Sequence, residues 1–286
     1  MRYRKTLQEL TIKDNFMFGA VMTDEDICKD FLEMVLGIKI AQLIVSKEKS
    51  FVYHPEYKGI RLDIIAADEK QTHYNVEMQV KYKENLGKRS RYYHSQIDMD
   101  LLTAGTDYDL LPESYVIFIC DFDPFHQKKY CYSFENICKE EKNLVLNDGN
   151  YTIFLSTRGE NKEDVPQELM NFLNYVKDEV PETTECEDEF VKRVQETVRK
   201  IKASREMEER YMLLKELIKE EREEAKEEGR AEGKAEFLLD FLSTMGELPI
   251  EVQEKIRKEQ DQNVLLDYLQ KAFKVRTIDE FLEQIL

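Results

Sequence analysis

Two short runs of alternating apolar and polar residues constrain this chain more than any other feature. The first run spans residues 60–67 and the second spans residues 74–80, and the segment 68–73 between them is rich in turn-forming residues. Because side chains alternate along a strand, each run has one apolar face and one polar face. The pattern therefore predicts an antiparallel β-hairpin.

The polar faces of this hairpin carry Asp63, Glu77 and Gln79. If the hairpin turns about Lys70, Asp63 lies directly across from Glu77 with Cβ atoms roughly 5 Å apart, where two carboxylates repel each other unless a cation neutralises them. Mg²⁺ is typically held by one or two carboxylates and keeps several waters, one of which can be activated to attack a phosphate. The spacing therefore favours phosphodiester cleavage, with Asp63 and Glu77 as ligands of Mg²⁺ or Mn²⁺. The alternative is a half-exposed hairpin whose polar face merely meets solvent, and the three-residue spacing taken alone is more often of that kind.

Longer segments add to this motif. They are DNFMFG at 14–19, GIRLD at 59–63, YNVEMQ at 74–79, RSRYY at 89–93, FICDFDPF at 118–125 and EGRAEG at 228–233. In these segments the chain resembles the PD-(D/E)XK nuclease superfamily, and more closely its bacterial Rpn-like family of recombination-promoting nucleases and transposases. The resemblance implies a restriction-endonuclease-like α/β core with a mixed central sheet flanked by helices. It also implies that Asp63 and Glu77 are the metal carboxylates and that Gln79 occupies the place of the motif's lysine.

Gln79 is a departure from the common motif. A lysine there would orient the attacking water and add positive charge near the phosphate, whereas a carboxamide can only orient and hydrogen-bond. Members of the superfamily with E-x-Q at this place are active nucleases, and Gln79→Lys is expected to be tolerated. Lys81 would share the face of Gln79 and could supply the missing charge. The alternative for Lys81 is an exposed strand end.

The net charge of −17 by itself argues against binding to a polyanion. However, residues 1–100 carry 16 basic and 16 acidic residues, so the excess negative charge lies in the rest of the chain. Directly after the motif, Lys81 is followed by Lys83, Lys88, Arg89 and Arg91, with only Glu84 against them. We predict that this patch contacts DNA phosphates, and the alternative is an ordinary solvated face.

The rest of the first 180 residues follows an α/β pattern. Helices are predicted at 24–36 and 88–102, a weaker strand at 43–53, a buried central strand at 115–120, and further strands at 130–134 and 151–155. In the second helix Tyr93, Ile97 and Leu101 share one stripe, and Arg89 lies on the same side one turn earlier. Asp14 is interpreted as an N-cap, with an accessory acid of the metal site as the alternative.

Composition excludes several classes of protein. There is no apolar run long enough to span a bilayer and no hydrophobic segment of a signal peptide after the first residues, so we expect a cytoplasmic protein. Five scattered cysteines lack metal-ligand spacing and are predicted to be reduced. The histidines also lack ligand-like spacing, and a histidine-based nuclease site is the weaker alternative. They are His54, His73, His94 and His126.

The second half of the chain divides into two further parts. Residues 181–235 are predicted to form a charged linker and a long helix or short coiled coil, and residues 236–286 a small helical domain. Within the helix, Gly229 and Gly233 lie four residues apart, which would let a second helix approach closely or would act as a hinge. We expect the protein to form homo-oligomers through these C-terminal helices.

These observations favour a metal-dependent DNA endonuclease that serves recombination or mobile-element transposition. The alternative, from a different class, is a catalytically weakened descendant that acts as a DNA-binding or oligomerising scaffold. Gln79 and the acidic second half favour the scaffold, whereas the pair of Asp63 and Glu77 favours the enzyme. A third candidate, an anion-binding structural domain without nucleic acid, has less support in the sequence.

Overall fold

A computed structural model of the chain describes residues 5–51, 60–102, 104–181 and 183–285. His54, the last two residues of the strand predicted at 43–53 and the first residue of the segment 59–63 lie outside these ranges. The strands are β1 (Leu43–Phe51), β2 (Ile60–Asp68), β3 (His73–Gln79), β4 (Ser114–Cys120), β5 (Cys131–Phe134) and β6 (Asn150–Ser156). The α-helices are α1 (Asn15–Met22), α2 (Glu25–Leu36), α3 (Leu86–Leu101), α4 (Gln167–Asp178), α5 (Glu189–Ala203), α6 (Arg205–Ser243), α7 (Ile250–Lys258), α8 (Gln262–Ala272) and α9 (Ile278–Ile285).

The described strands form one six-stranded mixed sheet in the order β1-β2-β3-β4-β6-β5. Strands β1, β2 and β3 are antiparallel neighbours, β3, β4 and β6 run parallel, and β5 pairs antiparallel with β6. The predicted central strand is β4, which is almost completely buried because it has a neighbour on each side and helices over both faces. The predicted α/β class and the hairpin of β2 and β3 are both confirmed.

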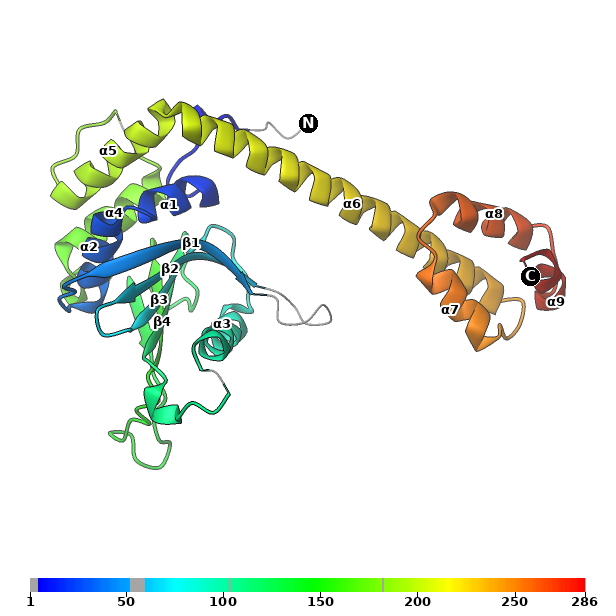
Figure 1. The fold of residues 1–286 in the computed structure, drawn as a ribbon, viewed down its shortest axis with the longest axis horizontal. Coiled ribbons are helices and arrows are strands. Elements are labelled where there is room, and N and C mark those ends of the chain that lie inside the picture. Colours follow the sequence, from blue (N-terminus) through cyan, green and yellow to red (C-terminus); the bar gives the residue numbers. More distant parts are fainter. Residues whose placement is uncertain (1–4, 52–59, 103, 182, 286) are drawn as a thin grey trace. The chain divides into compact units, whose positions relative to one another are not determined.

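Helices cover both faces of the sheet (Figure 1). Helix α3 lies over one face, while α1 and α2 lie over the other, next to β2 and β1. Val116, Phe118 and Cys120 of β4 belong to the buried cluster under α3, whereas Ile117 and Ile119, which alternate with them, point to the opposite face. Helix α2 ends at Gly37, whose φ of +67° suits a residue without a Cβ.

The first compact unit extends further along the chain than the predicted boundary at residue 180. It comprises Met1–Glu208, because α5 packs against α1, α2 and α4. Phe190, Val194 and Val198 of α5 are buried there, so this helix contributes to the core. Helix α4 was not predicted, and the long helix predicted from residue 190 onwards is divided at Ser204, which has extended backbone angles.

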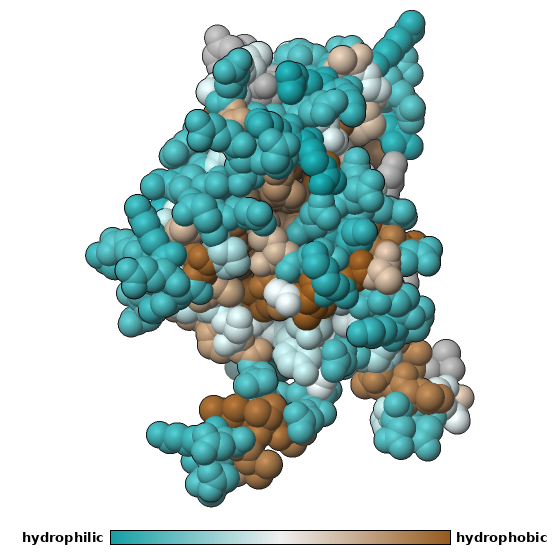
Figure 2. Space-filling model, turned by 90° about the vertical axis from the view of Figure 1, so that its left-hand side faces the viewer, coloured by the Kyte–Doolittle hydropathy of each residue, from teal (hydrophilic) through white to brown (hydrophobic). Residues whose placement is uncertain are grey.

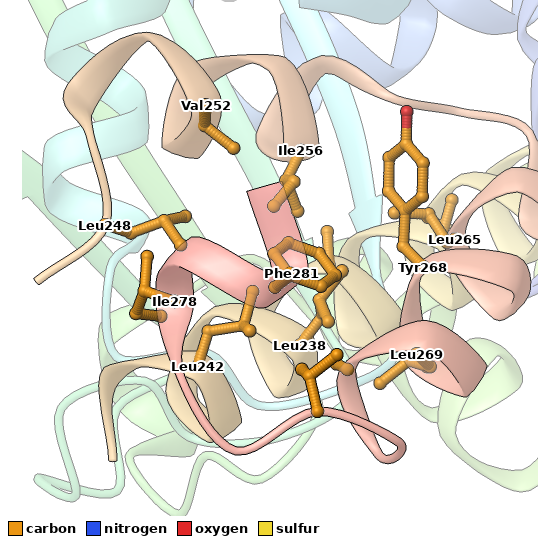
Figure 3. Close-up of a cluster of buried hydrophobic side chains, with 14 residues drawn as sticks. Leu238, Leu242, Leu248, Val252, Ile256, Leu265, Tyr268, Leu269, Ile278 and Phe281 are labelled. Carbon is orange, nitrogen blue, oxygen red and sulfur yellow. The ribbon is translucent and has the colours of Figure 1, made fainter. Parts of the chain in front are cut away.

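The second compact unit, Glu209–Leu286, has its own small core (Figure 3). Leu238 and Leu242 of α6 point toward residues of α7, α8 and α9, and the ring of Phe281 lies fully buried within this cluster. On α6 the buried small residues are Ala231 and Ala235, whereas a Cβ added at Gly229 or Gly233 would meet no atom within 4 Å. The two glycines therefore do not mediate a close helix approach within this unit, and α6 continues through both of them.

Charged and polar residues dominate the molecular surface. The face in Figure 2 is mostly hydrophilic, with smaller hydrophobic patches between the charged groups. This agrees with a chain in which 35% of the residues are charged. Among the described residues, no helix combines the length and the apolar character that crossing a membrane requires.

Candidate active site

The hairpin of β2 and β3 has the predicted register. Ile64 pairs with Val76, and the next pair in the same register is Asp63 with Glu77. The turn is held by Asp68, whose carboxylate accepts hydrogen bonds from the backbone N–H groups of Lys70 and Thr72 at 2.9 Å each. This local side-chain bonding explains why the turn centres on Lys70, as the sequence predicted.

Each of the two carboxylates also contacts the backbone of the opposite strand. The backbone N–H of Asp63 donates to Glu77 Oε1 at 3.1 Å, and the backbone N–H of Met78 donates to Asp63 Oδ2 at 3.3 Å. These bonds orient both side chains toward the same side of the hairpin. The structure therefore brings Asp63 and Glu77 together, as predicted from the alternation.

The face of β3 that carries Glu77 is buried. The alternative hypothesis, a hairpin whose polar face meets solvent, required it to be exposed. Glu77 is only 2% exposed, and in the parallel pairing with β4 it lies beside Phe118 under α3. Burial and the neighbouring Asp63 carboxylate raise the pKa of Glu77 well above its ordinary value. A buried acid beside a second acid is unfavourable in the charged form, so the site favours a positive charge.

Arg89 of α3 provides one such charge. Its Nη1 donates to Gln79 Oε1 at 2.8 Å, and its Nη2 lies 3.6 Å from Glu77 Oε2. The guanidinium also lies 5.3 Å from the ring centroid of Tyr93 and 5.9 Å from that of Phe118. Arg89 was predicted to contact DNA from an exposed patch, but it points at the site, with its side chain only 25% exposed. Its position on the same helix stripe as Tyr93 was the sequence signal for this orientation.

The other predicted basic residues remain on the surface. Lys83, Lys88 and Arg91 are exposed, as is Lys81. Strand β3 ends at Gln79, so strand alternation does not carry Lys81 onto the face of Gln79. The positive charge next to Gln79 therefore comes from Arg89 on the covering helix.

Asp14 occupies the N-cap position of α1, as predicted, but its side chain makes no capping hydrogen bond to that helix. Its carboxylate instead accepts from Lys5 Nζ at 2.8 Å and from the backbone N–H of Thr11 at 2.9 Å. These contacts tie the segment before α1 to the helix start, so the structure gives Asp14 a local structural role.

The buried histidine His94 and the cysteines have structural surroundings. His94 is buried, with Nδ1 2.7 Å from Ser114 Oγ and Nε2 3.0 Å from Thr152 Oγ1. Burial lowers the pKa of His94 to about 4. The five cysteines are free thiols, as predicted. Neither set brings ligand groups together among the residues that the structure describes.

The donor set fits a hard divalent cation. Mg²⁺ needs only one or two protein carboxylates, because waters and substrate phosphates complete its coordination, and Asp63 and Glu77 offer that number. Asn75 adds to the fit: it lies two residues before Glu77 on the same face of β3 and is completely buried. No hydrogen bond of ordinary geometry is made by its side-chain oxygen or nitrogen among the described residues, although the amide lies near enough to Glu77 to lower the pKa of that carboxyl. A metal-bound water would complete the bonding of this buried amide.

We expect Glu77→Gln to raise the thermal stability of the metal-free protein at neutral and higher pH. Because the pKa of Glu77 is raised on folding, the folded protein binds more protons than the unfolded chain, and stability falls as the pH rises through the raised pKa. Glutamine cannot ionise and still accepts the bond from Asp63 N–H. The gain in melting temperature, measured in EDTA, should grow from pH 5 to pH 9. Each kcal/mol gained in the free energy of unfolding corresponds to roughly 2–4 °C.

Glu84→Gln is the matched control, because Glu84 is exposed and no part of this site. It should leave the melting temperature nearly unchanged over the same range of pH. A melting temperature of Glu77→Gln at or below that of the wild type at pH 9 would contradict the raised pKa of Glu77.

Comparison with known protein families gives a match to this chain. A family model described as PD-(D/E)XK nuclease family transposase matches residues 15–229, which include all strands of the sheet and the whole hairpin. A search of curated proteins and a search of solved structures gave no match.

Proposed function

The chain belongs to the PD-(D/E)XK nuclease family transposases, and we propose that it is a divalent-metal-dependent DNA endonuclease that hydrolyses phosphodiester bonds in recombination or mobile-element transposition. The observation that carries the proposal is the pair of the half-buried Asp63 and the buried Glu77, joined across the hairpin, with Arg89 facing Glu77. Two neighbouring carboxylates, one of them buried and with one arginine beside them, are unfavourable for folding alone, and their geometry suits a metal-assisted reaction.

Asp63 and Glu77 would hold the metal ion, Mg²⁺ or Mn²⁺. When bound, the ion would polarise the phosphate and lower the pKa of a bound water. Gln79 accepts from Arg89 through Oε1, which leaves the donor end of its amide to orient the attacking water or a phosphate oxygen. Arg89 would offset the negative charge that builds up on the phosphate, and its hydrogen bond and ring contacts already hold it in position. Asn75 would orient a water at the base of the site.

Exposed basic residues next to the site would guide the DNA. Lys83, Lys88 and Arg91 lie on the loop before α3 and on its first two turns, directly after the strand that carries Glu77 and Gln79. Contacts from such residues to phosphates supply affinity without sequence information and weaken as salt rises. Lys81 would contact phosphates in the same way. Asp14 would not bind the metal ion and would affect the site only by fixing the position of α1.

Nicking of supercoiled plasmid tests the proposed activity. The full-length protein should cleave in the presence of Mg²⁺ or Mn²⁺ and should not cleave in EDTA. Asp98→Asn, an acid near the far end of α3, should cleave like the wild type. A pure and folded wild type that binds DNA but does not cleave it with either metal would favour the alternative function, a DNA-binding or oligomerising scaffold.

A feature of the long helix supports self-association within either function. Met212, Leu213 and Leu217 of α6 are each more than half exposed, which is unusual for large apolar side chains. We propose that this segment pairs with the same segment of a second copy, as a short coiled coil would. The proposed domain division then becomes residues 1–208 for the nuclease unit and residues 209–286 for assembly.

The full-length protein is therefore expected to be an oligomer, and the double variant Leu213→Lys/Leu217→Lys is expected to dissociate. Both residues are exposed in the single chain, so the dissociated variant should remain folded. A fragment of residues 1–208 should remain folded and monomeric, whereas one ending at residue 180 should be destabilised because it lacks the buried residues of α5. Light scattering and thermal melts measure these outcomes, and a double variant that stays oligomeric would exclude this segment as the interface.

A further inference from the structure

Three aromatic side chains form a partly exposed group next to the candidate active site. The rings of Tyr82 and Phe122 lie edge to face at 5.3 Å between centroids, and the rings of Tyr82 and His126 are 5.7 Å apart. Tyr82 is 48% exposed and His126 is also exposed, while Phe122 is half-buried against the cluster under α3. We call these three residues the aromatic platform.

The platform follows directly from the strands that carry the site. Gln79 pairs with Cys120 in the parallel register, and the backbone N–H of Asp121 donates to Gln79 O at 2.9 Å. Tyr82 is three residues beyond Gln79, and Phe122 is two residues beyond Cys120, which is about 7 Å at the rise of a strand. The platform therefore lies at the carboxyl ends of β3 and β4, beside Gln79 and on the face that α3 covers.

The loop that carries Phe122 and His126 is held in place by hydrogen bonds. The carboxylate of Asp123 accepts from the backbone N–H groups of Phe125 at 3.1 Å and Lys128 at 2.6 Å, and from Tyr132 OH at 2.7 Å. These bonds fix a turn in which His126 has a φ of +56°. The two rings that pack against Tyr82 are thus held in place, so a ligand that stacks on Tyr82 need not order this loop first.

Positive charge flanks Tyr82, as contact with a nucleic acid requires. The two acids on either side of Phe122 have partners of their own: Asp121 pairs with Lys13 and Arg158, and Asp123 accepts the loop hydrogen bonds. Lys81 and Lys83 flank Tyr82 in the sequence and are exposed, and Lys88 follows at the start of α3, with Glu84 as the acid among them. Aromatic side chains interleaved with lysines are the arrangement by which proteins hold single strands: the rings stack on bases and the lysines contact the phosphates on either side. Bases within a duplex hide their faces in the stack, so only an unpaired base can use such a platform.

We propose that the aromatic platform stacks on an unpaired base of the DNA, so that the enzyme prefers DNA with unpaired nucleotides beside the scissile phosphate. This inference rests on the proposed endonuclease function and names its substrate class: overhangs, flaps or gaps in preference to fully paired duplex. Tyr82 is 48% exposed and makes the main contact, while Phe122 and His126 pack against its ring.

The test compares two labelled DNAs, a fully paired duplex and the same duplex with a short single-stranded overhang. Their affinities for the full-length protein are measured by fluorescence anisotropy in EDTA, at one fixed salt concentration. The wild type should bind the overhang DNA about tenfold more tightly, which is a typical effect of one stacked base. Tyr82→Ala should lose this preference and bind both DNAs with the affinity that the wild type has for the duplex.

Tyr82→Phe should keep the preference because it keeps the ring, and Tyr108→Ala should also keep it. Tyr108 is the matched control because it is also an exposed tyrosine, at 82%. It follows the far end of α3, a helix about 24 Å long whose first turn carries Arg89 of the site. Tyr82→Trp adds a direct readout, since the sequence contains no tryptophan. Its fluorescence should be quenched by the overhang DNA and not by the duplex.

The outcomes separate this inference from the proposed function. Equal affinity of the wild type for both DNAs, or a preference that survives in Tyr82→Ala, overturns the platform while metal-dependent cleavage still stands. An equal loss of affinity for both DNAs in Tyr82→Ala also overturns it, because Tyr82 would then contact only the backbone. A wild type that neither binds nor cleaves either DNA overturns both the platform and the endonuclease.

Discussion

Asp63→Asn is expected to reduce metal-dependent cleavage by about a hundredfold to a thousandfold while the protein stays folded. Loss of one ligand removes much of the stabilisation that a metal supplies to the transition state, which is several kcal/mol, and each 1.36 kcal/mol corresponds to a factor of ten in rate. Asparagine keeps the acceptor oxygen for the backbone N–H of Met78, which Asp63 Oδ2 now contacts at 3.3 Å. The hairpin register should therefore survive the change.

Thermal melts distinguish a lost site from a lost fold. Asp63→Asn relieves repulsion on the buried Glu77, so its melting temperature in EDTA should equal or exceed that of the wild type. In the wild type Mg²⁺ should raise the melting temperature, as a ligand of the folded state does, and this shift should be much smaller in the variant. Unchanged nicking by a folded Asp63→Asn protein would exclude Asp63 as a metal ligand.

Changes at Gln79 and Arg89 are expected to have the second largest effect on the cleavage rate. Arg89→Gln should lower the cleavage rate by about a hundredfold, the size found when one preorganised group that stabilises transition-state charge is removed. Gln79→Lys alone should also be harmful, because it places an ammonium group where Arg89 now donates to Gln79 Oε1 at 2.8 Å. This differs from the expectation from sequence, in which Gln79→Lys is tolerated, since the sequence did not reveal the neighbouring guanidinium.

The double variant Gln79→Lys/Arg89→Gln should recover activity to within about tenfold of the wild type, because it returns one cation and one amide to the site in exchanged places. Recovery beyond the sum of the two single effects would measure the coupling between the residues. Lys88→Gln removes the same charge from the adjacent exposed position; as the loss of a phosphate contact it should weaken DNA binding, but it should change the cleavage rate at saturating DNA only slightly. A double variant no better than the worse single variant would show that Arg89 does not replace the motif's lysine.

Features set by local patterns were predictable from the sequence. The hairpin, its turn about Lys70 and the pairing of Asp63 with Glu77 follow from a two-residue alternation and from turn chemistry, both of which act within a few residues. The continuous apolar run of β4 similarly predicted a central strand, because only a strand covered on both faces is apolar throughout. The helix predicted at 24–36 is α2, which begins one residue later, at Glu25, and ends at Leu36 as predicted.

Features that depend on distant segments were not predictable. Glu77 and Gln79 look solvent-facing in the sequence, but α3 folds over them, so that Glu77 is buried and Arg89 points inward. Helix α5 is rich in charged residues, yet its apolar stripe completes the core against α1, α2 and α4. The first compact unit therefore ends at Glu208 and not near residue 180, where the sequence predicted its end.

The sequence by itself determined which residues could form the metal site and how they pair, since strand alternation and turn chemistry are local. Tertiary structure alone decided how that site is charged and covered. The cation beside Gln79 and the burial of Glu77 depend on which helix packs over β3, and that packing reflects the burial of whole apolar faces from segments far apart in the chain.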